Sequence, residues 1–97
     1  MQVKNAIETK LTAGLSPSRL DIEDQSHRHQ GHAGAHPEGE SHFHVTIVSA
    51  AFEGKSAVAR QRLVYDLLAE ELRSRVHALS LTTLTPAEAS ARATLNR

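Results

Sequence analysis

Histidine is concentrated in one part of this 97-residue chain, which contains no cysteine. Six of the seven histidines lie within one short stretch, namely His27, His29, His32, His36, His42 and His44. The seventh, His77, stands alone in the run Val76-His77-Ala78-Leu79. Imidazole is the commonest metal ligand and titrates near neutral pH, so this distribution indicates metal or proton chemistry. Because the chain has no thiol, it cannot by itself hold an all-thiolate metal centre.

The spacing of these histidines leaves alternatives open. The pattern His-x-His-x-x-His-x-x-x-His from His27 to His36 matches no rigid zinc signature, although a flexible tract of this kind binds zinc, nickel or copper weakly. His42 and His44 lie two residues apart and could chelate together, but a solvent-facing sheet surface also needs polar residues at alternate positions. By itself, His77 is compatible either with a ligand or with a structural hydrogen bond at the start of an apolar strand.

The bulk composition excludes several classes of protein. Eleven acidic and eleven basic side chains cancel, which argues against a chain whose main task is to coat nucleic acid or an anionic membrane. No window approaches the roughly 18 consecutive apolar residues of a membrane helix, and the N-terminus lacks the apolar core of a signal peptide. The absence of cysteine is compatible with a reducing compartment. We therefore expect one small cytoplasmic domain that does not contact membranes.

The N-terminal part of the chain predicts a helix, a strand and a long loop. Apolar residues recur there at helical spacing, at Val3, Ile7, Leu11 and Leu15. This predicts a helix over about residues 2–14, ended by Gly14 and Pro17, and the alternation over residues 19–24 predicts a strand. Residues 25–40 hold glycines, a proline and histidines, with almost no apolar side chain, so they cannot contribute to a core. A loop of this length in a compact domain is typically functional or disordered.

The remaining elements follow from periodicity and from one strong cap. Phe43, Val45 and Ile47 alternate with His42, His44 and Thr46, which predicts a second strand with one apolar face. A turn at residues 53–55 leads into an amphipathic helix from 56 to about 75, and residues 76–83 predict a third strand. Thr85-Pro86-Ala87-Glu88 is a helix start with a capping box. The order α-β-β-α-β-α predicts an α+β domain with a three-stranded mixed sheet covered by helices on one face, in an undetermined strand order.

Two further motifs were tested against known chemistry. Gly54-Lys55-Ser56 resembles the end of a P-loop, but that loop needs a glycine where Ser49 stands, so a turn and a helix cap explain these residues better. Lys55, Arg60 and Arg62 form a possible basic patch for nucleic acid, although an ordinary solvated helix face accounts for them as well. No nucleophile elbow or convergent acid pair supports an enzyme.

Several separated blocks of the sequence resemble the BolA family. They are Glu40-Ser41-His42-Phe43, Ile47-Val48-Ser49, Phe52-Glu53-Gly54-Lys55-Ser56, Leu63-Val64-Tyr65, Glu70-Glu71-Leu72, Val76-His77-Ala78-Leu79-Ser80 and Thr85-Pro86. The resemblance covers nearly the whole chain and implies a fold related to the type II KH domain, with a short extra helical turn before the long helix. We accordingly expect a BolA-like domain over residues 1–92, containing the loop at about 25–40, and a tail over 93–97.

The resemblance also implies a partner and a cofactor. BolA-like proteins form heterodimers with monothiol glutaredoxins and share a [2Fe-2S] cluster, so no cofactor is expected in the isolated chain. The family's cluster histidine matches His77, and the loop ligand matches His29 best, with His27, His32 and His36 as alternatives. Neutral imidazole can replace a thiolate on iron, and the remaining thiolates would come from the glutaredoxin and its glutathione.

Some family members are described as DNA-binding transcriptional regulators of stress and cell-shape genes, which makes DNA a second possible partner. The basic edge of the long helix, with Lys55, Arg60 and Arg62, would then contact phosphates. Many relatives have Arg-His-Arg where this chain has Arg60-Gln61-Arg62, so no role of that histidine is transferred. The chain also lacks the Gly-x-x-Gly loop that grips nucleic acid in KH domains.

Overall fold

The computed structural model describes residues 2–25, 42–74, 76 and 78–95. Along the chain the elements are α1 (Gln2–Leu15), β1 (Arg19–Asp24), β2 (His42–Val48), the short 3-10 helix η2 (Ala50–Phe52), α2 (Ala57–Leu67), α3 (Ala69–Ser74), β3 (Ala78–Leu84) and α4 (Pro86–Leu95). The predicted α+β class and both of the first two strands are confirmed. The extra helical turn implied by the family resemblance is η2.

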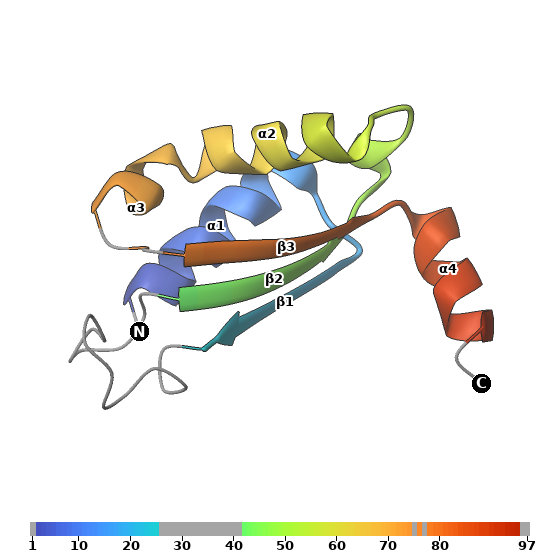
Figure 1. The fold of residues 1–97 in the computed structure, drawn as a ribbon, viewed down its shortest axis with the longest axis horizontal. Helices are drawn as coiled ribbons and strands as arrows, with labels where there is room; N and C mark the ends of the chain where they lie inside the picture. The colour runs from blue at the N-terminus through green and yellow to red at the C-terminus, as the bar shows by residue number, and fades with distance from the viewer. Residues whose placement is uncertain (1, 26–41, 75, 77, 96–97) are drawn as a thin grey trace.

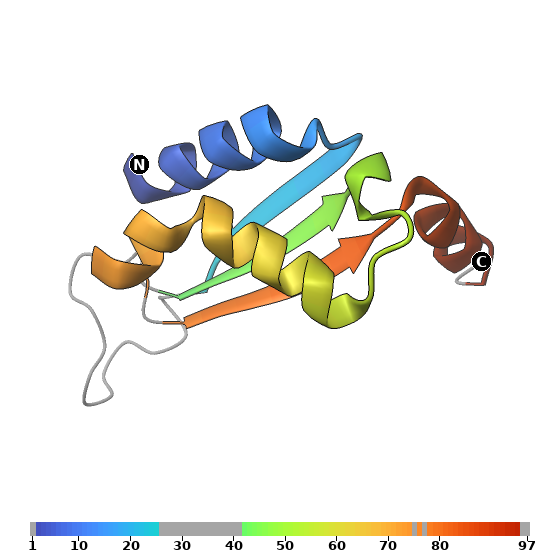
Figure 2. The ribbon, with the colours of Figure 1, turned by 90° about the horizontal axis from the view of Figure 1, so that it is seen from above.

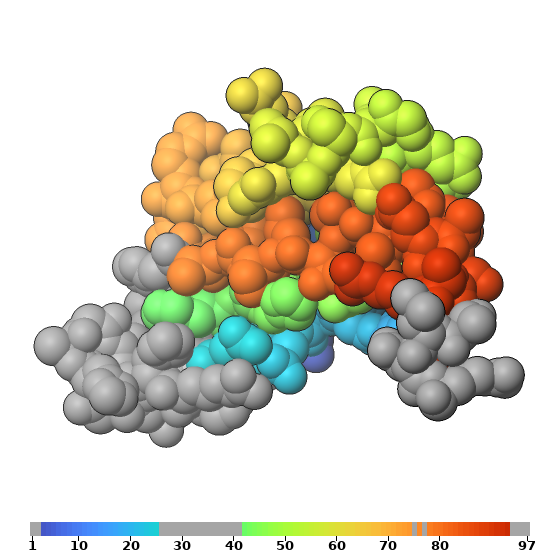
Figure 3. Space-filling view, turned by 45° about the vertical axis from the view of Figure 1, so that its right-hand side comes forward, coloured from blue at the N-terminus to red at the C-terminus, as the bar shows by residue number. Residues whose placement is uncertain are grey.

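The described strands form one mixed sheet in the order β1-β2-β3. β1 is antiparallel to β2, and β2 is parallel to β3, so the connection between the parallel strands crosses over through α2 and α3. Helices α1, α2 and α3 lie on one face of the sheet, and α4 stands beyond the end of β3 (Figures 1 and 2). In the space-filling view α2 lies along β3, with β2 and β1 following on the other side (Figure 3). The opposite face of the sheet is not covered by α1, α2 or α3.

The core lies between the sheet and these three helices. The predicted apolar stripe of α1 is buried, as is the apolar face of β2, whose side chains alternate between buried and partly exposed. The buried apolar side chains are Val3, Ile7, Leu11, Leu15, Phe43, Val45, Ile47, Val48, Phe52, Val64, Leu68 and Val76. Leu79 and Leu81 of β3 pack against this cluster. Burial of apolar surface of this kind is the main favourable term in folding.

The end of α1 differs from the predicted stop. The helix continues through Gly14 to Leu15, and Ser16 ends it with a positive φ of 44°. A Cβ atom built on Gly14 would lie 2.8 Å from a terminal methyl carbon of Leu67, so this glycine allows α1 and α2 to approach closely. The stop therefore belongs to Ser16 and Pro17, because Gly14 serves packing between helices.

The single long helix predicted from 56 to about 75 is wrong in one respect, because it is divided into α2 and α3. Leu68 lies between them with φ −105° and ψ 17°, outside helical geometry, and its side chain is buried. The break rotates α3 so that Glu71 faces Lys10 of α1, at 2.8 Å. Sequence periodicity did not reveal it because both segments continue the same apolar period.

The predicted start of α4 is confirmed. The Thr85 amide donates to the Glu88 carboxylate at 2.9 Å, and the Glu88 amide donates to the Thr85 hydroxyl at 3.2 Å, which is a capping box. Arg60 of α2 donates to the same carboxylate at 2.7 Å. The predicted boundary at residue 92 is wrong, because α4 continues to Leu95, inside the segment assigned to a tail.

Replacing Glu88 by glutamine should weaken the protein at neutral pH and matter progressively less in acid. The hydrogen bond from Arg60 and then that from the Thr85 amide lower the pKa of Glu88 from 4.5 to about 2. A carboxyl whose folded-state pKa is depressed stabilises the fold above its unfolded pKa, and this contribution is lost as the pH falls towards the folded value. Urea unfolding of both proteins at about pH 6 and about pH 2 measures this. Glu53→Gln, on an exposed turn, is the control, and equal behaviour of the two variants would contradict the clamp.

Candidate functional site

Both predicted cluster ligands, His77 and the loop histidine His29 with its alternatives, lie outside the described residues. The residues that flank them are described. β1 ends at Asp24, β2 begins at His42 and β3 begins at Ala78, and the register pairs Asp24 with Phe43 and His42 with Ala78. The Gln25 amide also donates to the His42 carbonyl at 2.7 Å. The chain therefore leaves β1 and enters β2 and β3 at one end of the sheet, which is called the ligand end below.

A cavity of about 220 Å³ lies at the ligand end. It is lined by Gln25, His42, Phe43, Ala78, Leu79 and Ser80. Phe43 is buried, whereas Ala78 and Ser80 are exposed, so the cavity combines an apolar base with an accessible polar rim. Such a recess can receive a projecting group from a partner.

The chain is held firmly where it approaches β3. Val76 is buried, and its amide donates to the Glu71 carbonyl at 2.8 Å. Glu71 is itself only 8% exposed and pairs with Lys10, whose pKa is raised above 10.5 mainly by this hydrogen bond. Glu71 thus ties α3 to α1 immediately before the strand that follows residue 77.

The described histidines do not form a metal centre. The His44 Nδ1 atom lies 2.7 Å from the Ser80 hydroxyl, and its Nε2 atom lies 3.2 Å from the Thr82 hydroxyl, so both ring nitrogens are engaged by β3. Among the described residues, no group of three or more histidine, cysteine, aspartate or glutamate side chains could hold a metal ion. For His42 and His44, this geometry favours the polar sheet surface over the chelating pair.

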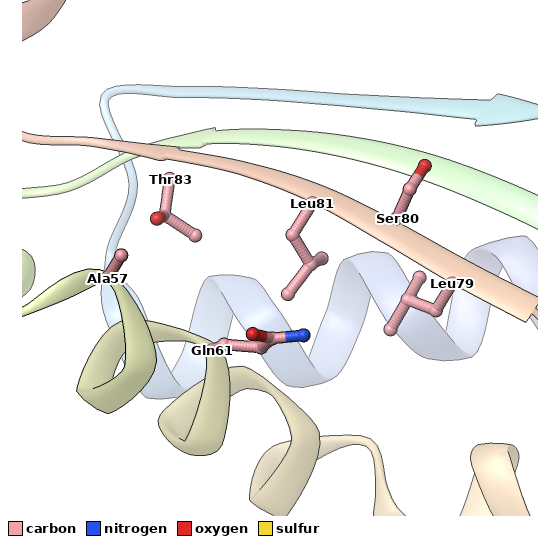
Figure 4. Close-up of a pocket in the computed structure, with 6 residues that line it drawn as sticks. All are labelled: Ala57, Gln61, Leu79, Ser80, Leu81 and Thr83. Carbon is pink, nitrogen blue, oxygen red and sulfur yellow. The ribbon is translucent and has the colours of Figure 1, made fainter.

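A second recess, of about 380 Å³, runs along the outer edge of β3 (Figure 4). Leu79, Leu81 and Thr83 line it from the strand, and Gln61 lines it from α2. The Tyr65 hydroxyl donates to the Leu79 carbonyl at 3.3 Å and receives a hydrogen bond from Gln61 at 3.0 Å. Side chains of α2 therefore cover part of the strand edge, a role that the sequence pattern did not indicate.

Arg60 is engaged within the chain, contrary to its predicted part in a basic patch. Its side chain is 12% exposed, and it donates to Glu88, to the Lys55 carbonyl and to the Thr83 carbonyl. Its guanidinium also lies 5.8 Å from the centre of the Phe52 ring. Lys55 is exposed like Arg62, so these two residues remain available for contacts with nucleic acid.

Within the part of the chain that the structure describes, no helix is long and apolar enough to cross a membrane.

Comparison with known proteins identifies the family. A family model for BolA-like proteins matches residues 11–88. The chain is 52% identical to SufE-like protein 1 of Arabidopsis thaliana and 52% identical to its chloroplastic protein BOLA1, over 84% and 81% of this chain. It spans only 23% and 51% of those two proteins. It is 45% identical, over 88% of this chain and 77% of the relative, to the DNA-binding transcriptional regulator BolA of Escherichia coli.

Solved structures agree with the sequence comparison. The BolA domain of SufE1 from Arabidopsis thaliana superposes with a TM-score of 0.81 at 49% identity, covering 91% of this chain and 96% of that one. BolA1 from the same plant gives a TM-score of 0.79 at 43% identity, covering 91% of this chain and 96% of that one. From the family model, the relatives and the shared three-stranded fold, the chain belongs to the BolA family.

Proposed function

We propose that this chain is a non-enzymatic partner of a monothiol glutaredoxin, with which it co-ligates a bridging [2Fe-2S] cluster through His77 and a loop histidine, His29 first. The role would be in iron-sulfur trafficking or in iron and redox signalling. The observation that carries the proposal is the ligand end: the described residues on either side of both histidine-bearing segments lie at the same end of the sheet. A cytoplasmic location remains part of the proposal.

The donor chemistry of the chain supports this role. With no cysteine, the chain can offer imidazole nitrogen but not thiolate, so a complete cluster site requires a thiol-bearing partner. Glutaredoxin and its bound glutathione would supply the thiolates. Exchanging sulfur for nitrogen ligands raises the reduction potential of such clusters, because imidazole donates less negative charge to iron than thiolate does. The result would be a cluster with altered stability and transfer.

The position of the ligand end supports ligand presentation. Glu71 and Val76 hold the chain before residue 77, and the first pair of β3 with β2, Ala78 with His42, holds it afterwards. Side chains held by rigid flanking elements lose less conformational entropy on binding than side chains of free segments. A ligand between two held points is therefore suited to capture of a preformed cluster.

The test is a titration of cluster-loaded monothiol glutaredoxin and glutathione with the purified chain, followed by visible absorption and circular dichroism. We expect new visible dichroic bands that saturate at one chain per glutaredoxin, together with a heterodimer in size-exclusion chromatography. Glutaredoxin spectra that remain unchanged over the whole titration would contradict the proposal.

DNA binding is the second candidate function, favoured by the name of the Escherichia coli relative. Because Arg60 is engaged within the chain, Lys55 and Arg62 would carry the phosphate contacts. Replacing both by alanine should flatten the dependence of log K on log salt by about 1.8, since each phosphate contact contributes about 0.9. Equal affinities for promoter and random DNA, lost at physiological salt, would leave only non-specific contact.

A further inference from the structure

We propose that the uncovered face of the sheet carries a binding site for a small organic anion beside α4, at the opposite end from the ligand end. The ligand class is a carboxylate or phosphate group on a short apolar stem. The cavity here has a volume of about 310 Å³, close to the lower limit of small-molecule sites, which run from about 300 to 1,000 Å³. This volume restricts the ligand to a few carbon atoms.

The cavity is built by the strand register and by the turn into α4. On the uncovered face, Arg19, Val48 and Leu84 stand in one row across the three strands. Thr46 and Thr82 are paired in the next row, so their hydroxyl groups lie beside that row. Because α4 starts at Pro86, directly after β3, its alanines and Arg92 close one side of the recess (Figure 1).

The polar groups in this cavity are suited to an anion. Arg92 is exposed and has no hydrogen bond or ion pair within the described residues. Arg19 contacts Asp21 through Nε at 2.6 Å, which leaves its two terminal nitrogens without a partner in the same part of the chain. Asp21 is the acidic neighbour of the site, so two guanidinium groups face one carboxylate. Guanidinium groups bind carboxylate and phosphate with two parallel hydrogen bonds, which gives both strength and orientation.

The apolar half of the cavity accounts for the stem. Val48 is buried and Leu84 is partly buried, and both line the cavity on the uncovered face rather than the face that meets α1. Ala89 adds a small side chain from α4, which leaves room above the strands. An anion with a hydrocarbon end would cover this surface, whereas inorganic phosphate would use only the arginines and threonines.

The test is a titration of the full chain with butyrate, with the neutral isostere butyramide and with inorganic phosphate, followed by amide chemical shifts. We expect saturable shifts for Thr46, Thr82 and Arg92 with butyrate, at millimolar affinity, and none with butyramide. Phosphate shifts without butyrate shifts would assign the site to phosphate, and the reverse to carboxylates. Saturation by neither anion, or equal shifts with butyramide, would overturn the proposal.

Variants separate this site from general charge effects. Arg92→Gln should weaken binding about tenfold, because one charge-assisted pair is lost. Arg73→Gln on α3 removes the same charge elsewhere and should leave the affinity unchanged. Thr46→Val keeps the strand propensity and removes only a hydroxyl, so it tests the site if Arg92→Gln disturbs α4. Equal weakening by the Arg92 and Arg73 variants would show general electrostatic attraction instead.

Discussion

Replacing His77 by alanine should abolish the visible dichroic bands that the chain induces in cluster-loaded glutaredoxin. On the proposed function, His77 supplies the nitrogen that completes the mixed coordination, and alanine offers no donor. The glutaredoxin would then keep its own cluster spectrum through the whole titration. The measurement is visible circular dichroism at equal protein concentrations, with size-exclusion chromatography to separate loss of coordination from loss of docking.

Two controls make this result specific. His44→Ala removes an imidazole that is held by β3 hydroxyls on the uncovered sheet face, so it should leave the bands intact. His77→Cys restores a donor as thiolate and should yield a spectrum closer to that of the all-thiolate cluster. Single alanine variants of His27, His29, His32 and His36 then identify the loop ligand, and we expect His29→Ala to have the largest effect. An unchanged response from His77→Ala would contradict the ligand assignment while leaving the anion site untouched.

Replacing Phe52 by alanine should be among the most destabilising single changes in the chain. The ring is fully buried at the end of η2, where it belongs to the main core cluster and lies beneath the Arg60 guanidinium. Truncation of a buried phenylalanine costs about 3–5 kcal/mol, because the transfer free energy is lost and a cavity remains. Small domains have a total stability of about 5–15 kcal/mol, so the variant would lose a large part of its free energy of unfolding.

The measurement is urea unfolding followed by far-ultraviolet circular dichroism, with comparison of midpoints at a constant slope. Val58→Ala is the matched control, because Val58 lies nearby on α2 but is 56% exposed, and it should change stability by less than about 0.5 kcal/mol. Stability of Phe52→Ala within about 1 kcal/mol of the parent protein would contradict the packing described for η2.

The proposed site separates into a part that the sequence could predict and a part that it could not. His77 and His29 were selected through the family resemblance, and no described contact tests them. That the segments carrying them start from one end of the sheet follows from the pairing of His42 with Ala78, which joins residues far apart in the chain. The anion cavity was not foreseen, because Arg19 and Arg92 approach one recess only through the register and the turn into α4.

By itself the sequence determined the elements that depend on local spacing. The alternation around Phe43, the stripe of α1 and the capping box at Thr85 act over a few residues, so the chain encodes them directly. Tertiary structure alone decided the strand order, the break at Leu68, the packing role of Gly14 and the engagement of Arg60 with Glu88. These features arise from contacts between distant segments, whose free energies override local propensity and leave no periodic mark in the sequence.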